Sequence, residues 1–189
     1  MRCLQKRVEM STLLKVTISG PPGSGTSTLV AKIAESRGWR SMNGGDVFRE
    51  EARSRGLSVE QLSSEAKEDT NVDRHLDDLL QKRMLSRESP EIVESRLSGW
   101  WAHKHDLECV RVWVSVSDEE RARRIQKREG GEFSDCLQRS QQRQEDDMDR
   151  YSSLYGIDLD DMSPYHLVID ADSKDEFEVF NEVDFILGR

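Results

Sequence analysis

The stretch of this sequence with the clearest potential for chemistry is a glycine-rich loop. It consists of nine residues: Gly20, Pro21, Pro22, Gly23, Ser24, Gly25, Thr26, Ser27 and Thr28. Glycines let a backbone curl so that successive N–H groups point inward and approach anionic oxygens closely. The loop follows an apolar, β-branched segment and precedes a helical pattern, so a helix N-terminus adds its partial positive charge. This context predicts a phosphate-binding loop rather than a simple glycine-rich turn.

One position in this phosphate loop departs from the pattern G-x-x-x-x-G-K-[ST]. Thr26 stands where the pattern has lysine, and Ser27 falls on the hydroxyl that ligates Mg²⁺. Threonine supplies no charge to the β- and γ-phosphates. Either the loop has lost its ligand, or cations from elsewhere replace the lysine. A basic cluster favours replacement: Arg121, Arg123, Arg124, Lys127 and Arg128. From it we expect Arg124 to contact the bound triphosphate and Arg128 to act in catalysis.

Two further features contain acidic residues at positions where they could bind a ligand. Glu94 ends a short apolar run, where a carboxylate could hold the water shell of Mg²⁺ or could merely cap an element. Asp46 and Arg49 lie one helical turn apart, which is typical of a solvated ion pair or of a pair that binds a ligand.

Arg143, Asp147 and Arg150 have spacings of four and three, which place them on one helix face. Only Met148 and Tyr151 interrupt the polar run from 138 to 153, so a core-facing stripe is missing. This segment is either a surface ladder of ion pairs or a lid that closes over a charged ligand and excludes water.

Five motifs together make the sequence resemble the archaeal-type cytidylate kinases over about residues 13 to 173. They are GPPGSGTST at 20–28, GGDVFRE at 44–50, ESRLSGW at 94–100, ERARRIQKREG at 120–130 and YGIDLDDMSPYHLVID at 155–170. Threonine at the lysine position is familiar in that group. The resemblance implies phosphoryl transfer from ATP, with Mg²⁺, to CMP and dCMP.

The resemblance also implies roles for individual residues. Arg96 would bind the acceptor phosphate, Asp46 and Arg49 a base edge and a phosphate, and Asp73 would share their pocket. Arg143 and Arg150 would meet phosphates, while Asp147 would hold the acceptor nucleoside and orient Arg143. Bacterial relatives have an aspartate after the arginine of the third motif, where this chain has Leu97, so no base-recognition role transfers to position 97.

The elements that must position these residues alternate between strands and helices. We expect strands near 13–19, 39–42, 91–94, 110–116 and 167–170, and helices at 27–37, from Asp46 onward, twice within 58–88, at 118–129, at 134–155 and at the C-terminal end. Such alternation predicts a parallel sheet covered on both faces, with ligands at the carboxyl ends of the strands. Together with this alternation, the resemblance implies a three-layer α/β P-loop kinase fold with a five-stranded parallel sheet, monophosphate-binding helices and a helical lid.

Within this fold we expect residues 1–12 to form a disordered tail and 13–189 to form one domain. Its monophosphate-binding region would span about 44–88 and its lid about 120–153.

Composition excludes some partners. The formal net charge of −9 argues against general affinity for nucleic acid or an anionic membrane. Cys3, Cys109 and Cys136 lie far apart and show no metal-ligand spacing, which is typical of reduced cytoplasmic thiols. Together with the resemblance to cytidylate kinases, this leads us to expect a cytoplasmic, monomeric enzyme that acts on small nucleotides. The alternatives are an adenylate or UMP kinase, and a nucleotide-binding regulator without turnover.

Overall fold

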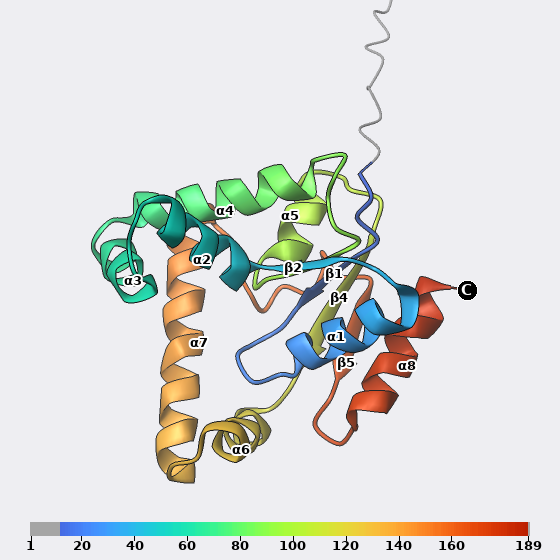
Figure 1. Ribbon diagram of the computed structural model, residues 1–189. Coiled ribbons are helices and arrows are strands. Elements are labelled where there is room, and N and C mark those ends of the chain that lie inside the picture. The colour runs from blue at the N-terminus through green and yellow to red at the C-terminus, as the bar shows by residue number, and fades with distance from the viewer. Residues whose placement is uncertain (1–11, 189) are drawn as a thin grey trace, which may run out of the picture.

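A five-stranded parallel sheet forms the centre of the molecule in the computed structural model, which describes residues 12–188 (Figure 1). The strands are β1 Val16–Ser19, β2 Ser41–Asn43, β3 Ile92–Glu94, β4 Val110–Ser115 and β5 Leu167–Asp170. Their order in the sheet is β2-β3-β1-β4-β5, and every neighbouring pair is parallel. The expected parallel, five-stranded α/β fold is confirmed, whereas nearly all of the expected tail lies outside the described residues.

Eight helices connect and cover these strands within the described range. They are α1 Thr26–Arg37, α2 Gly44–Ser54, α3 Val59–Glu68, α4 Thr70–Met84, α5 Ser98–Lys104, α6 Asp118–Glu129, α7 Phe133–Tyr155 and α8 Glu176–Leu187. Helices α1 and α8 lie side by side on one face of the sheet, and α5 packs on β1 from the other face (Figure 1). The sheet is therefore the middle of three layers.

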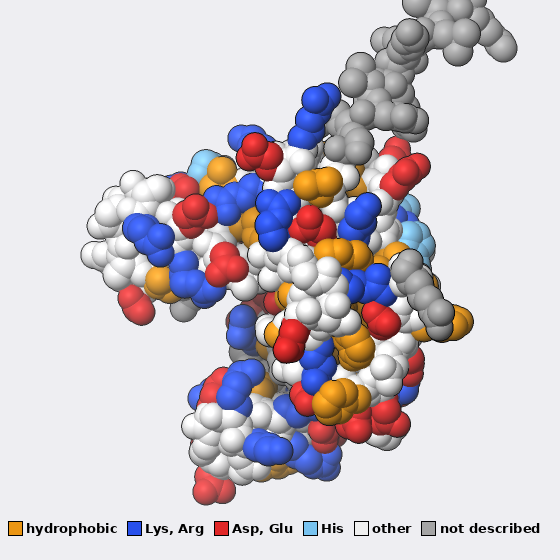
Figure 2. Space-filling model, turned by 45° about the vertical axis from the view of Figure 1, so that its right-hand side comes forward, with side chains coloured by type: hydrophobic (Ala, Val, Ile, Leu, Met, Phe, Trp, Pro, Cys, Tyr) orange, Lys and Arg blue, Asp and Glu red, His pale blue; other side chains and the backbone are white. Residues whose placement is uncertain are grey.

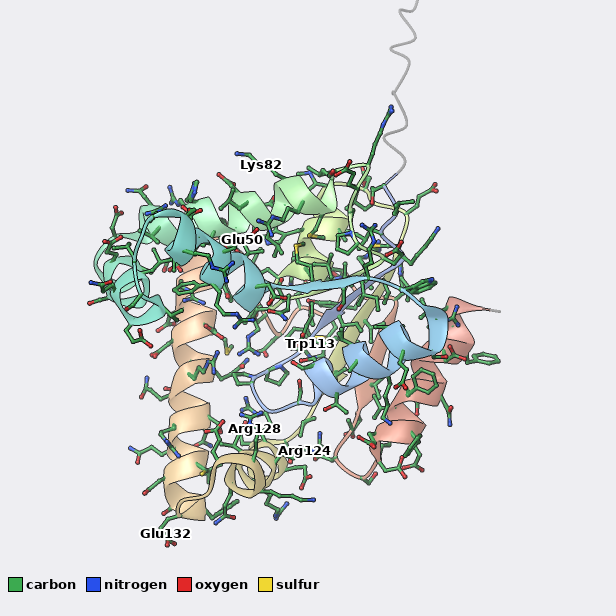
Figure 3. The ribbon with its side chains drawn as sticks, in the orientation of Figure 1. Glu50, Lys82, Trp113, Arg124, Arg128 and Glu132 are labelled. Atoms are coloured by element: carbon green, nitrogen blue, oxygen red, sulfur yellow. The ribbon has the colours of Figure 1, made fainter. Side chains whose placement is uncertain are left out.

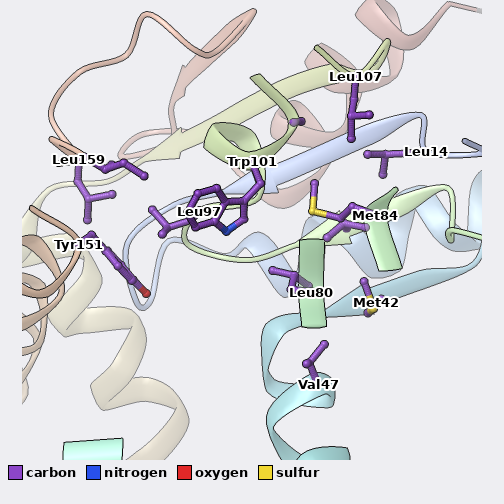
Figure 4. Packing of buried hydrophobic residues seen from close by; sticks show 13 residues of the cluster. Leu14, Met42, Val47, Leu80, Met84, Leu97, Trp101, Leu107, Tyr151 and Leu159 are labelled. Atoms are coloured by element: carbon purple, nitrogen blue, oxygen red, sulfur yellow. The ribbon is translucent and has the colours of Figure 1, made fainter. Parts of the chain in front are cut away.

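Each face of the sheet has its own hydrophobic core. Ile33 of α1 and Val183 of α8 are fully buried against the inward side chains of β1, β3 and β4. On the opposite face, Met84, Trp101 and Tyr151 join α4, α5 and α7 in a second cluster (Figure 4). This second cluster packs the C-terminal end of α7 against α4 and α5, and the N-terminal end of α7 extends away from it (Figure 1).

One local expectation was wrong, and one helix was missed. Helix α2 begins at Gly44 rather than at Asp46, because Asn43 is its N-cap: the Asn43 side chain accepts from the Asp46 N–H at 2.8 Å. Asp46 is the third helical residue and completes a capping box. Helix α5 was not predicted, since its seven residues contain a glycine and paired tryptophans rather than an amphipathic stripe.

Helices α6 and α7 form an arm on the side of the sheet where the phosphate loop lies. They pack against each other and are joined by a short turn at Gly130 and Gly131, both of which have positive φ (Figure 1). The arm faces α2, α3 and α4, which form a lobe above it in Figure 1. Among residues 12–188, the structure has no helix of the length and apolar character needed to cross a membrane.

Candidate active site

The phosphate loop connects β1 to α1, as its composition predicts. Gly25 is the N-cap of α1 and adopts φ +92°, a left-handed conformation that favours glycine. At Gly20, a Cβ atom would lie 2.6 Å from the Ser24 hydroxyl oxygen and 2.7 Å from the Val114 carbonyl oxygen. The loop therefore packs against the carboxyl end of β4 too closely for a side chain at position 20. Its backbone N–H groups and the N-terminus of α1 form a cradle with the geometry of an anion site.

Two cavities open on either side of this loop, and the recess between the arm and the upper lobe is visible in Figure 2. The first, of about 690 Å³, is bounded by the loop, α2, α4 and α7. The second, of about 640 Å³, is bounded by the loop, α6 and the start of α8. All nine loop residues line one cavity or both. The residues common to the two cavities are Gly23, Thr26, Ser27 and Arg128.

The Ser27 hydroxyl and the Glu94 carboxylate meet in the lining of the first cavity. Ser27 Oγ donates to Glu94 at 3.0 Å and 3.3 Å from its two carboxylate oxygens. Among the described residues no group of three or more His, Cys, Asp or Glu side chains could enclose a metal ion. Mg²⁺ at a triphosphate needs only one or two protein oxygens, because phosphates and waters supply the others. A hydroxyl and a carboxylate beside a phosphate cradle fit that requirement.

A buried ion-pair network lies behind the loop. Arg96 donates to Asp147 Oδ2 through Nε at 3.0 Å and Nη2 at 2.7 Å, and its Nη1 donates to the Gly20 carbonyl oxygen. Arg150 Nη2 donates to the other oxygen of Asp147 at 2.8 Å. Burial lowers the pKa of Arg96, an effect that the charge of Asp147 opposes. The network joins the phosphate loop to α7 through one arginine.

This network alters one expectation. Arg143, Asp147 and Arg150 all line the first cavity, as their spacing predicts for one helix face. Asp147, however, orients Arg96 and Arg150 rather than Arg143. Arg143 is exposed, and within residues 12–188 the structure records no hydrogen bond or ion pair for it. Its guanidinium is therefore available to a ligand in the cavity.

The residues expected at the acceptor end occupy different places. Arg49 and Asp73 line the first cavity, and Asp73 lies 3.8 Å from Arg150 Nη1. Burial raises the pKa of Asp73, while Arg150 opposes the shift. Asp46 is outside the cavity lining: its carboxylate accepts from the Asn43 N–H at 3.3 Å and from Arg49 Nη2 at 2.6 Å. The structure thus shows the i,i+3 ion pair for Asp46 within a helix cap, and its contact with a base edge stays a prediction.

The basic residues of α6 lie in different surroundings: one arginine is buried in the protein, and two others lie beside the phosphate loop. Arg121 is buried to 2% exposure and pairs with Asp118, so it cannot serve as a ligand-binding cation. Arg124 donates to the Ser24 carbonyl oxygen at 3.1 Å and to the Ala171 carbonyl oxygen at 2.5 Å. Arg128 is exposed and pairs only with its neighbour Glu129 among the described residues. Figure 3 shows Arg124 and Arg128 on the side of α6 that faces the phosphate loop.

Sequence reasoning missed Asp77 and Tyr155. Asp77 of α4 lines the first cavity and accepts a hydrogen bond from the Tyr155 hydroxyl of α7 at 2.7 Å. Burial raises the pKa of Asp77 to about 6. The spacing of four between Asp73 and Asp77 placed both on one face of a helix, but Asp78 beside them removed any reason to single out Asp77.

A phosphate cradle on a parallel sheet, with a serine–carboxylate pair and arginines from an adjoining helical arm, defines a P-loop kinase. Comparisons with known proteins agree. A family model described as "AAA domain" matches residues 19–148. The chain is 41% identical to the cytidylate kinase of Archaeoglobus fulgidus over 86% of this chain and 88% of that protein. It is 34% identical to the cytidylate kinase of Methanopyrus kandleri over 88% of this chain and 89% of that protein. The chain belongs to the cytidylate kinase family.

The fold is shared more widely than this family. The crystal structure of shikimate kinase from Bacteroides thetaiotaomicron matches with a TM-score of 0.61 and 13% identity, covering 93% of this chain and 99% of that chain. At such low identity the likeness concerns the fold alone.

Proposed function

We propose that this chain transfers the γ-phosphoryl group of ATP to CMP and dCMP, giving ADP and the corresponding diphosphate. The observation that carries the proposal is the pair of cavities that meet at the phosphate loop. Direct transfer between two nucleotides requires two sites that open onto one point, and Gly23, Thr26, Ser27 and Arg128 line both. Membership of the cytidylate kinase family supports CMP as the acceptor.

In this proposal the second cavity takes ATP. Backbone N–H groups of the phosphate loop hold the phosphates, and Arg124 contacts the donor from α6 while its bonds to the Ser24 and Ala171 carbonyls hold it between the loop and the end of β5. Ser27 and Glu94 hold Mg²⁺, which neutralises charge on the β- and γ-phosphates when bound. Thr26 occupies the lysine position of the P-loop pattern. Arg128 supplies the missing positive charge, because it lines both cavities.

The first cavity takes the acceptor. Arg96, already oriented by Asp147 and the Gly20 carbonyl, binds the acceptor phosphate, with Arg49 on the α2 side. Arg143 and Arg150 stabilise the charge that develops during transfer. Phosphoryl transfer needs little covalent chemistry, so positioning and charge neutralisation supply the rate.

A coupled assay for ADP, run with ATP and each nucleoside monophosphate in turn, tests the proposal. We expect the highest kcat/KM with CMP, followed by dCMP. A preference for AMP or UMP would assign the chain to another kinase specificity. Nucleotide binding without turnover on any monophosphate would identify a regulator instead. We expect the enzyme to work in the cytoplasm as a monomer, which light scattering at assay concentration would check.

A further inference from the structure

The part of the first cavity that lies farthest from the phosphate loop is walled by α2 and α4. Val47 and Phe48 come from α2, and Leu76 and Leu80 come from α4. These apolar side chains make a slot of the kind that takes a flat heterocycle. Since the arginines that fit the acceptor phosphate lie nearer the loop, the acceptor base would occupy this slot. A carboxylate in the slot would then contact an edge of the base.

Of the three acids near this slot, Asp77 alone both lines the cavity and forms no ion pair with any residue from 12 to 188. Asp46 lies outside the cavity lining and is held by its helix cap and Arg49. Asp73 faces the guanidinium of Arg150. Asp77 uses Oδ2 to accept from Tyr155, while the structure records no hydrogen bond of its Oδ1 with any residue from 12 to 188.

We propose that Asp77 determines acceptor specificity, with its free carboxylate oxygen accepting a hydrogen bond from the 4-amino group of cytosine. Tyr155 is a positioning residue: its hydroxyl occupies the other oxygen and fixes the plane of the carboxylate. Uracil carries a carbonyl oxygen where cytosine carries the amino group, so the same carboxylate repels it. This inference rests on the proposed function, because it assigns one contact within the acceptor site.

The surroundings of the pair support a fixed geometry. The Tyr155 ring packs edge-on against Trp101, with centroids 4.9 Å apart, and so is half-buried against the hydrophobic core. Burial and the nearby Asp77 raise the pKa of Tyr155 above its usual value, so the phenol keeps its proton and stays the donor. Asp77 is thus held as an acceptor by a donor that comes from 78 residues away.

The experiment compares kcat/KM for CMP and UMP in wild-type protein and three variants. Asp77→Asn keeps the shape and an acceptor for Tyr155, but its amide group can donate to uracil. We expect the CMP:UMP ratio to fall about tenfold or more. Tyr155→Phe should lower the ratio by a smaller factor. The control is Asp78→Asn, which removes the same charge one residue away on the exposed side of α4 and should leave the ratio within twofold.

Three results would overturn the inference. One is an unchanged ratio in Asp77→Asn with CMP activity retained. Another is an equal loss for both acceptors, which would make Asp77 structural. The third is a ratio in Asp78→Asn that falls as far as in Asp77→Asn. The wild-type protein separates this inference from the proposed function. If it fails to phosphorylate CMP, the proposed function fails; if it prefers CMP and Asp77→Asn does not change that preference, only the role of Asp77 fails.

Discussion

Two substitutions on α7 should have different effects. Asp147→Ala should lower thermal stability, whereas Arg143→Ala should lower kcat and leave stability nearly unchanged. Asp147 is 8% exposed and neutralises Arg96, whose side chain is only 11% exposed. Removing one partner of a buried ion pair costs about 3–5 kcal/mol, because the remaining charge stays buried without compensation. At about 2–4 °C per kcal/mol for a domain of this size, Asp147→Ala should lower Tm by about 6–20 °C.

Arg143 lies one turn earlier on the same helix but is exposed and has no bonded partner in the described part of the chain. Surface substitutions of this kind change stability by about 0.5 kcal/mol or less, so Tm should stay within about 2 °C. If Arg143 stabilises transferring charge, its loss should lower kcat about a hundredfold, which corresponds to about 2.7 kcal/mol of transition-state stabilisation. Arg139→Ala is the matched control, since Arg139 lies another turn away on α7 and lines neither cavity.

Thermal denaturation followed by circular dichroism and the coupled ADP assay measure the two quantities. A wild-type Tm in Asp147→Ala would refute the argument that Arg96 depends on this counter-charge. If Arg143→Ala kept more than a third of the wild-type kcat, the cation at the transfer point would have to be sought in Arg128 or Arg150.

Other substitutions test the remaining parts of the site. Gly25→Val should abolish ATP binding in calorimetry, because the φ of +92° is strained for any side chain; undiminished affinity would contradict the role of the loop. Thr26→Lys should not raise kcat substantially, since Arg128 already supplies the charge, and a tenfold gain would show an impaired native loop. Glu94→Gln should raise the Mg²⁺ concentration needed for half-maximal rate; an unchanged requirement would remove Glu94 from the metal site. Asp77→Asn should be more stable than wild type at pH 8 by up to about 3 kcal/mol, because the Asp77 pKa rises from 3.8 to about 6 on folding and ionising it there opposes folding. This advantage should shrink as pH falls from about 6 toward 4, and a pH-independent difference in urea denaturation would count against the shift.

The phosphate loop and the class of fold could be predicted from sequence because they depend on contiguous residues. Loop geometry follows from the glycines of nine consecutive positions, and the strand and helix patterns on each side place it at the sheet edge. Local spacing also placed Arg143, Asp147 and Arg150 together on one cavity wall. The start of α2 was missed because Asn43 and Asp46 are both good capping residues, and only the backbone geometry distinguishes the cap from its reciprocal partner.

The partner of each charged group was decided by tertiary structure. Asp147 has arginines available three and four residues away on its own helix, yet it also pairs with Arg96, 51 residues distant, because α7 packs beside the carboxyl end of β3. Arg121 and Arg124 look equivalent along the chain, but the packing of α6 buries one and turns the other toward the loop. Asp77 and Asp78 differ only in which side of α4 they occupy. Sequence by itself predicted a phosphate-binding loop and its position, whereas the tertiary contacts of α4, α6 and α7 decided which acids and arginines line the cavities, since that depends on residues far apart in the chain.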